Sequence, residues 1–173
     1  MARYSTSIES QTAQLSGVNS GLTVNGYMGY WGASATSGYR LRRVTVGLRT
    51  TTTAAITAQQ IVVGIYRQTV APAGTGLVAA VLGQAMETHT PQTEPTVGAI
   101  ATNATAIGTT APTLAAQPIK RIVLNSQNSF DYPFEFMEEL ICPIGTANGF
   151  AFVNLNNTLP GLSVIVLDIE IEV

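Results

Sequence analysis

The chain has 173 residues, of which 46% are hydrophobic and only 10% are charged, and its formal net charge is −2 at pH 7. Disordered chains combine low hydrophobicity with high charge, and nucleic-acid-binding proteins concentrate basic residues on one face, so the composition argues against both classes. The sequence also lacks a run of the roughly eighteen apolar residues that would predict a membrane-spanning helix. We therefore expect one globular domain with its own core, and neither nucleic acid nor membrane as a partner.

Residues 1–38 are polar and interrupted by glycines, so they predict an extended N-terminal arm with a first short strand near residues 26–32. Aromatic side chains in an arm need a surface to pack on, which is either their own domain or a neighbouring subunit. The candidate subunit-contact residues of this region are Tyr4, Ile8, Tyr27, Tyr30 and Trp31. We expect the arm to be dispensable for folding and needed for assembly.

A regular alternation predicts a strand in residues 41–49, at the start of the main domain of residues 39–173. Val44, Val46 and Leu48 share one face of this strand, which is the pattern of an antiparallel strand with one buried side. The basic residues of the strand and its flanks are Arg40, Arg42, Arg43 and Arg49. We expect them to form a solvated or subunit-contacting face.

Apolar residues at almost every position predict a strand covered on both faces in residues 60–68. One face carries Ile61, Val63 and Ile65, and the other carries Val62 and Tyr66. Residues 70–118 follow as a long insert rich in Ala, Thr and Pro, which we expect to be mostly loops. Within the insert, residues 97–107 are a candidate strand, and residues 77–86 are a short helix or strand.

Strand patterns return in the C-terminal part of the chain, in residues 119–125, 129–136 and 149–156. Aromatic residues share one face of the second of these segments. Pro133 in its middle cannot donate a backbone hydrogen bond, so this strand is expected at a sheet edge or a bulge.

The final segment, residues 162–173, carries the most regular strand pattern. Its odd positions form one unbroken apolar face that we expect to be buried: Ile165, Leu167, Ile169, Ile171 and Val173. The even positions begin with three candidate subunit contacts, Leu162, Val164 and Val166, and end with the acidic Asp168, Glu170 and Glu172, which keep an outer face or edge soluble. Because this strand follows residues 149–156 after a short turn, we predict that the two form an antiparallel hairpin.

The residue types needed for catalysis or metal binding are scarce. His89 is the only histidine, so no zinc site is expected, and the only cysteine, Cys142, lies in an apolar run that predicts a buried, inert thiol. A Cys142–His89 pair of nucleophile and base is the alternative. The acidic row of the last strand would bind calcium only if further oxygen ligands completed the site, and the candidates are Asp131, Glu135, Asn154 and Asn156. We expect no catalytic site, no metal, no cofactor and no enzymatic activity.

About eight predicted strands, joined by loops rich in Thr, Gly and Pro, indicate an all-β protein, either a two-sheet sandwich or a barrel. The informative segments are, in order, Leu41 to Val44, Val63 to Arg67, Phe134 to Glu139 before Cys142 and Pro143, Gly149 to Val153, and the acidic last strand. This order resembles the small jelly-roll structural proteins of bacteriophages, over residues 40–70 and 119–173. The resemblance implies a single jelly-roll-like antiparallel β-sandwich with an extended N-terminal arm.

The resemblance also implies a function. It points to a virion structural protein, a capsid or capsid-decorating subunit that is made in the host cytoplasm and acts through self-assembly and contacts with other virion proteins. A homo-oligomer is expected, preferably a trimer. The alternative is a receptor- or glycan-binding module of a phage tail or head fibre, in which Tyr27, Tyr30 and Trp31 would stack on sugar rings.

Overall fold

The computed structural model of the protein describes residues 3–9, 27–33, 35–36, 38–50, 56–70, 113–135, 137–155 and 163–173. These ranges contain strands and no helix, and therefore no helix that could cross a membrane, so the prediction of an all-β protein is confirmed. The strands are β1 (Arg3–Glu9), β2 (Tyr27–Gly32), β3 (Tyr39–Thr50), β4 (Gln60–Val70), β5 (Thr113–Leu114), β6 (Lys120–Asn125), β7 (Phe130–Pro133), β8 (Leu140–Cys142), β9 (Gly149–Asn154) and β10 (Ser163–Glu172). The elements predicted at residues 77–86 and 97–107 lie outside the described residues.

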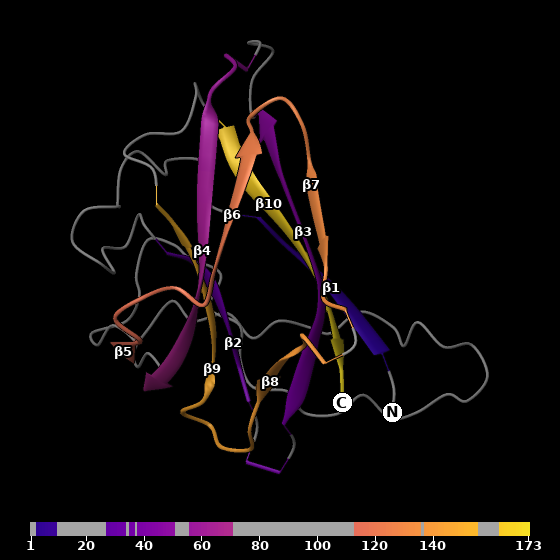
Figure 1. Ribbon diagram of the computed structural model, residues 1–173, viewed down its shortest axis with the longest axis vertical. Coiled ribbons are helices and arrows are strands. Elements are labelled where there is room, and N and C mark those ends of the chain that lie inside the picture. The colour runs from indigo at the N-terminus through magenta and orange to yellow at the C-terminus, as the bar shows by residue number, and fades with distance from the viewer. Residues whose placement is uncertain are drawn as a thin grey trace.

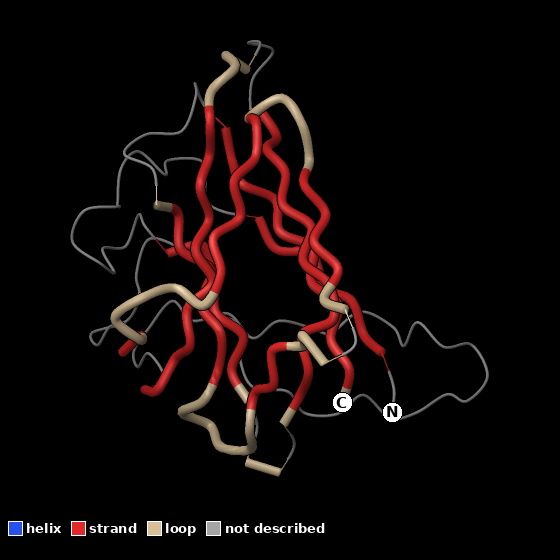
Figure 2. The backbone as a smooth tube through the Cα atoms, in the orientation of Figure 1, coloured by secondary structure: helices blue, strands red, loops and turns tan. Residues whose placement is uncertain are grey.

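The strands form two antiparallel sheets that pack as a sandwich (Figures 1 and 2). In sheet A, β10 lies between β1 and β3, and the short strands β8 and β7 follow one another along the other edge of β3. In sheet B, β9 lies between β2 and β4, and the short strands β6 and β5 share the other edge of β4 in the same way. The two sheets are therefore built alike, from three full strands and one outer edge made by two short ones.

The pairing partners are nested along the chain. The first strand pairs with the last, β1 with β10, and the second pairs with the one before the last, β2 with β9. Further inside the chain, β3 pairs with β8 and β7, and β4 pairs with β6. Successive pairs lie alternately in sheet A and sheet B, so the chain crosses from one sheet to the other between them.

The hairpin predicted for the last two strands is wrong. β9 pairs with β2 and β4 in sheet B, whereas β10 pairs with β1 and β3 in sheet A. Nearness along the chain favours a hairpin, but it is only one of several influences on strand pairing. All six residues of β9 are buried, so it takes a central place in sheet B, while the chain crosses to the centre of sheet A for β10.

The N-terminal region also differs from the prediction. β1 pairs with β10 without a register shift, from Arg3 opposite Glu172 to Glu9 opposite Val166. Tyr4 is only 1% exposed and belongs to the core cluster. Of the two surfaces open to an aromatic ring in this region, Tyr4 therefore packs on its own domain. Residues 3–9 are part of the sandwich and not of a detached arm, and β2 confirms the short strand expected near residues 26–32.

The core lies between the sheets. The odd positions of β10 from Ile165 to Ile171 are at most 1% exposed, and Val173 packs against the same cluster, so the prediction of a buried odd face is confirmed. Sheet B contributes the opposing side chains, which are Ile61, Val63, Ile65, Ile122, Leu124, Phe150 and Phe152. Each such side chain stabilises the fold by about 1.5–3 kcal/mol when it is fully buried.

A β-bulge in β3 lets even-numbered residues after it and odd-numbered residues before it face the same core. Leu41 and Val44 are both buried, although an unbroken strand would place them on opposite faces. The register against β10 shifts at this point, just after Glu170, which lies opposite Arg43. Arg42 is the extra residue, and the bulge frees its side chain from the alternation of the strand.

Candidate functional site

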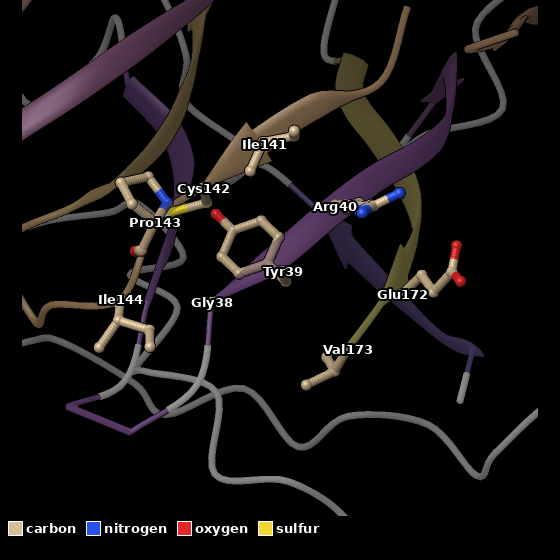
Figure 3. Close-up of a pocket in the computed structure, with 9 residues that line it drawn as sticks. All are labelled: Gly38, Tyr39, Arg40, Ile141, Cys142, Pro143, Ile144, Glu172 and Val173. Atoms are coloured by element: carbon tan, nitrogen blue, oxygen red, sulfur yellow. Dashed lines mark hydrogen bonds between the residues drawn. The ribbon is translucent and has the colours of Figure 1, made fainter. Parts of the chain in front are cut away.

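An apolar hollow of about 290 Å³ lies at one end of sheet A, where β8, the start of β3 and the end of β10 meet. Figure 3 shows the ring of Tyr39 in its middle, with the hydroxyl directed toward Cys142 and Pro143. Ile141, Ile144 and Val173 surround this ring. Arg40 and Glu172 point away from it, so the hollow has an apolar lining with charge only at its rim.

The side chains around the hollow are unusually exposed for their type. Ile141 is 54% exposed and Ile144 is 59% exposed, and Pro143 between them is exposed as well. With the partly buried Val173, these residues form what we call the apolar patch. Scattered apolar residues are normal on a surface, but a contiguous group around a hollow marks a binding or contact site.

A tight turn after β8 holds Ile144 outward. Gly145 adopts a φ of 129°, a conformation that side chains with a Cβ rarely tolerate. The backbone N–H of Asn148 donates to the Gly145 carbonyl oxygen at 3.0 Å, and its side-chain Nδ2 donates to the Ile144 carbonyl oxygen at 2.9 Å. The turn is therefore fixed by its own hydrogen bonds and not by burial of Ile144.

The two titratable groups at the floor of the hollow, the thiol of Cys142 and the hydroxyl of Tyr39, are held in their neutral, protonated forms. Burial raises the pKa of the Cys142 thiol, and it raises the pKa of the Tyr39 hydroxyl well above its usual value. Both groups therefore stay protonated near neutral pH, and the thiolate that a nucleophile needs is disfavoured. This agrees with the inert thiol predicted for Cys142, while its alternative partner His89 lies outside the described residues.

A buried ion-pair cluster lies beside the patch. The guanidinium of Arg42 contacts the carboxylates of both Glu139 and Glu172, and the side chains of the three residues are 16%, 6% and 9% exposed. Glu139 comes from the turn before β8, and Glu172 comes from the end of β10. The cluster therefore ties both margins of the patch to β3, at the bulge that releases Arg42.

A second, more exposed set of ion pairs continues along the outer face of sheet A. Arg43 donates from Nε and Nη2 to the Asp131 carboxylate at 2.7 and 2.5 Å, and its Nη1 lies 3.5 Å from Glu170. The hydroxyl of Thr45 donates to the same Asp131 carboxylate at 2.9 Å. The hydrogen bonds from Arg43 lower the pKa of Asp131, and the acid in turn raises the pKa of Arg43.

These pairs bear on the calcium alternative. Glu170 and Glu172 face arginines, and so does Asp131, one of the residues considered as a completing ligand. Within the described residues, no group of three or more acidic, His or Cys side chains is arranged to hold a metal ion. Of the other ligand candidates, Glu135 is exposed, Asn154 is buried in β9, and Asn156 lies outside the described residues.

The predicted contact residues are only partly placed. Tyr4 is a core residue, and Val166 is half-buried on the outer face of sheet A. The remaining ones have side chains outside the described part of the structure: Ile8, Tyr27, Tyr30, Trp31, Leu162 and Val164. The structure instead exposes Ile141 and Ile144, which the sequence analysis missed. The sequence feature that could have indicated them is a short apolar run that ends in a turn.

Comparisons with known proteins do not extend this picture. No family model matches the chain, and no curated protein or solved structure matches it. The functional argument therefore depends on the strand arrangement and on the exposed surface.

Proposed function

We propose that the protein is a structural subunit of a bacteriophage particle, a jelly-roll sandwich that acts through contacts with copies of itself and with other virion proteins. The observation that carries this proposal is the nested order of the strand pairs. Support comes from the apolar patch and from the low charge of the chain, since a weakly charged surface does little to repel its neighbours.

The nested order is the arrangement expected when one long antiparallel ribbon is rolled into two sheets. In a jelly roll, eight strands form two Greek keys, and the outermost strands of the ribbon pair with each other. If β5 with β6, and β7 with β8, each count as one interrupted edge, the described residues provide eight strand positions in the two sheets. Jelly rolls are common in viral capsids and in lectins, so the surface must decide between these functions.

The apolar patch favours a protein partner over a sugar. Sugar sites offer an exposed aromatic face with polar side chains around it, but the aromatic residue in this hollow, Tyr39, is only 3% exposed. The exposed groups are the aliphatic side chains of Ile141 and Ile144 together with Pro143. Aliphatic groups of this kind are buried well by another protein surface and poorly by hydroxyl-rich ligands.

The test is self-association of the purified chain, measured by multi-angle light scattering and sedimentation over a range of concentrations. We expect a discrete oligomer whose interface buries more than about 1,000 Å². The double variant Ile141→Asp/Ile144→Asp should weaken association without lowering the melting temperature. The matched control is Val123→Asp, because Val123 is similarly exposed at 47% but lies on β6 of the other sheet.

Two results would contradict the proposal. One is a chain that stays monomeric at every concentration and is not found in repeated contacts when particles containing it are imaged by electron microscopy. The other is specific binding of an oligosaccharide that Ile141→Asp/Ile144→Asp leaves intact, which would favour the glycan-binding alternative.

A further inference from the structure

The two edges of sheet A differ in how open they are to further strands. On one edge, β7 ends at Pro133, and β8 is three residues long with its Ile141 carbonyl oxygen accepting a hydrogen bond from Nη1 of Arg67 at 3.2 Å. On the other edge, β1 pairs with β10 and with no further strand among the described residues (Figure 1). β1 runs for seven residues without a bulge and contains no proline, so it lacks three of the usual protections of an edge strand, namely shortness, a bulge and proline.

The sequence of β1 is complementary to itself when it is read in opposite directions. If two copies pair antiparallel with full overlap, Arg3 of each copy comes opposite Glu9 of the other. In the same register, Tyr4 comes opposite Ile8, Ser5 opposite Ser7, and Thr6 opposite Thr6 on the two-fold axis. An opposite-charge pair, an aromatic–aliphatic pair and a hydroxyl pair are all combinations that stabilise neighbouring strands.

We propose that β1 is a dimerisation strand, which pairs antiparallel with β1 of a second copy and joins their A sheets into one continuous sheet. The partner is a second copy because β1 read in the opposite direction supplies the complementary order of residue types. The contact is isologous, so every favourable pair occurs twice. The proposal rests on the proposed structural function and deepens it by naming one contact and its register.

The open edge of sheet B provides a comparison. β6 also pairs without a register shift over six residues, and Lys120 and Arg121 are its only charged residues. Pairing β6 with itself in full overlap would place Lys120 opposite Asn125 and Arg121 opposite Leu124, with no pair of opposite charge. Self-complementarity is therefore not shared by β6 and does not follow from an edge position alone.

Charge reversal tests both the contact and its register. Arg3→Glu alone places Glu opposite Glu9 twice per dimer, and Glu9→Arg alone places Arg opposite Arg3 twice. Each single variant should weaken the dimer about tenfold, because two attractive pairs become repulsive. The double variant Arg3→Glu/Glu9→Arg should restore the affinity of the unmodified chain. A mixture of the two single variants should form heterodimers in preference to either homodimer, which native mass spectrometry resolves by mass.

A disulfide test is independent of charge. Thr6→Cys places a thiol on the two-fold axis, and mild oxidation should link the two copies covalently. Ser5→Cys is the matched control and should link poorly, because position 5 faces position 7 of the partner. The native Cys142 does not interfere, since it is buried. The melting temperature of each variant shows whether it is folded. This matters most for Arg3→Glu, because position 3 lies opposite Glu172, and the Thr6→Cys result does not depend on that variant.

The outcomes separate this inference from the proposed function. Heterodimer preference together with selective linking at position 6 supports β1 pairing. Association that is unchanged by both charge reversals, with equal linking at positions 5 and 6, overturns β1 pairing and leaves the proposed function standing. A chain that is monomeric in solution also overturns the pairing, whereas the proposed function fails only if particle imaging shows no subunit contacts either.

Discussion

The central strands β10 and β9 of the two sheets present different kinds of side chain on their outer faces. On sheet A, β10 presents Glu170 opposite Arg43 of β3, with which it forms an ion pair, and Asp168 opposite Thr45. On sheet B, β9 presents Ala151 and Val153, which are 0% and 5% exposed. The centre of one outer face is thus charged and partly solvated and the centre of the other is apolar and buried, whereas Val123 on the edge strand β6 of sheet B is 47% exposed.

The difference explains two contrasting strand patterns. On β10 the inner face is buried, whereas Val166, Asp168 and Glu170 are half-buried or exposed and only Glu172 at the end is buried, in its ion pair. Every residue of β9 is buried. Gly64, beside β9, marks how tightly the outer face of sheet B is covered. A Cβ at this position would lie 2.7 Å from a ring carbon of Tyr66 and 3.0 Å from a methyl of Leu155. Polar substitutions should therefore be tolerated at exposed positions on the outer face of β10 but not on the outer face of β9.

The largest effect is expected on the inner face of sheet A. Ile169→Asp buries a carboxylate without a partner in the core and should destabilise the fold by about 4 kcal/mol. Glu170→Lys, one residue away on the outer face, replaces attraction to Arg43 with repulsion and should cost about 1 kcal/mol or less. Denaturant unfolding of both variants measures the contrast, and equal destabilisation would mean that the outer face is structural too.

The outer side of β9, at the centre of sheet B, should behave like a core. Val153→Asp should destabilise the protein by about 3 kcal/mol, because Val153 is buried even though it points away from the space between the sheets. The control is Asp168→Val on sheet A, the reverse exchange at an exposed position, which should change stability by about 0.5 kcal/mol or less. If Val153→Asp were as mild as its control, the comparison between the faces would not hold.

The ion pairs of sheet A should themselves differ in strength with burial. Arg42→Ala leaves the carboxylates of Glu139 and Glu172 nearly buried without a cation and should cost about 2 kcal/mol. Arg43→Ala breaks a more exposed pair and should cost clearly less. Thermal unfolding of the two variants at low and high salt provides the measurement. Added salt should reduce the difference in melting temperature between the unmodified chain and Arg43→Ala. It should hardly change this difference for Arg42→Ala, because buried ion pairs are little screened.

The smallest effect is the acid dependence of the Arg43–Asp131 pair. The pKa of Asp131 is lower in the folded state than in the unfolded state, so its ion pair stabilises the fold above the ordinary aspartate pKa. That contribution is lost as the pH falls through the lowered value. Asp131→Asn should therefore reduce stability at neutral pH and flatten its decline in acid, measured by unfolding between pH 6 and about pH 2. Thr45→Ala removes the weaker hydrogen bond to Asp131 and should flatten the decline of stability in acid less than Asp131→Asn does.

Local patterns were sufficient for much of the fold. The buried faces of β4 and β10 follow directly from alternation at Ile61, Val63 and Ile65 and at the odd positions of the last strand. Pro133 correctly indicated an edge, since among the described strands β7 pairs with β3 alone. The bulge was not predicted, although burial of both Leu41 and Val44 requires one. The candidate site was not predicted either, because the exposure of Ile141 and Ile144 depends on which segments pack over β8.

The sequence by itself determined the all-β class, the positions of most strands and the inner face of each alternating strand, because side chains in a strand alternate with a period of two whatever the strand pairs with. Only the tertiary structure decided which strands pair. β1 meets β10 from the opposite end of the chain, and β9 and β10 separate into different sheets, because pairing depends on contacts between distant residues that no local pattern records. The same contacts brought Arg42 to Glu139 and Glu172 and placed β1 beside β10, with no further strand on its other side among the described residues.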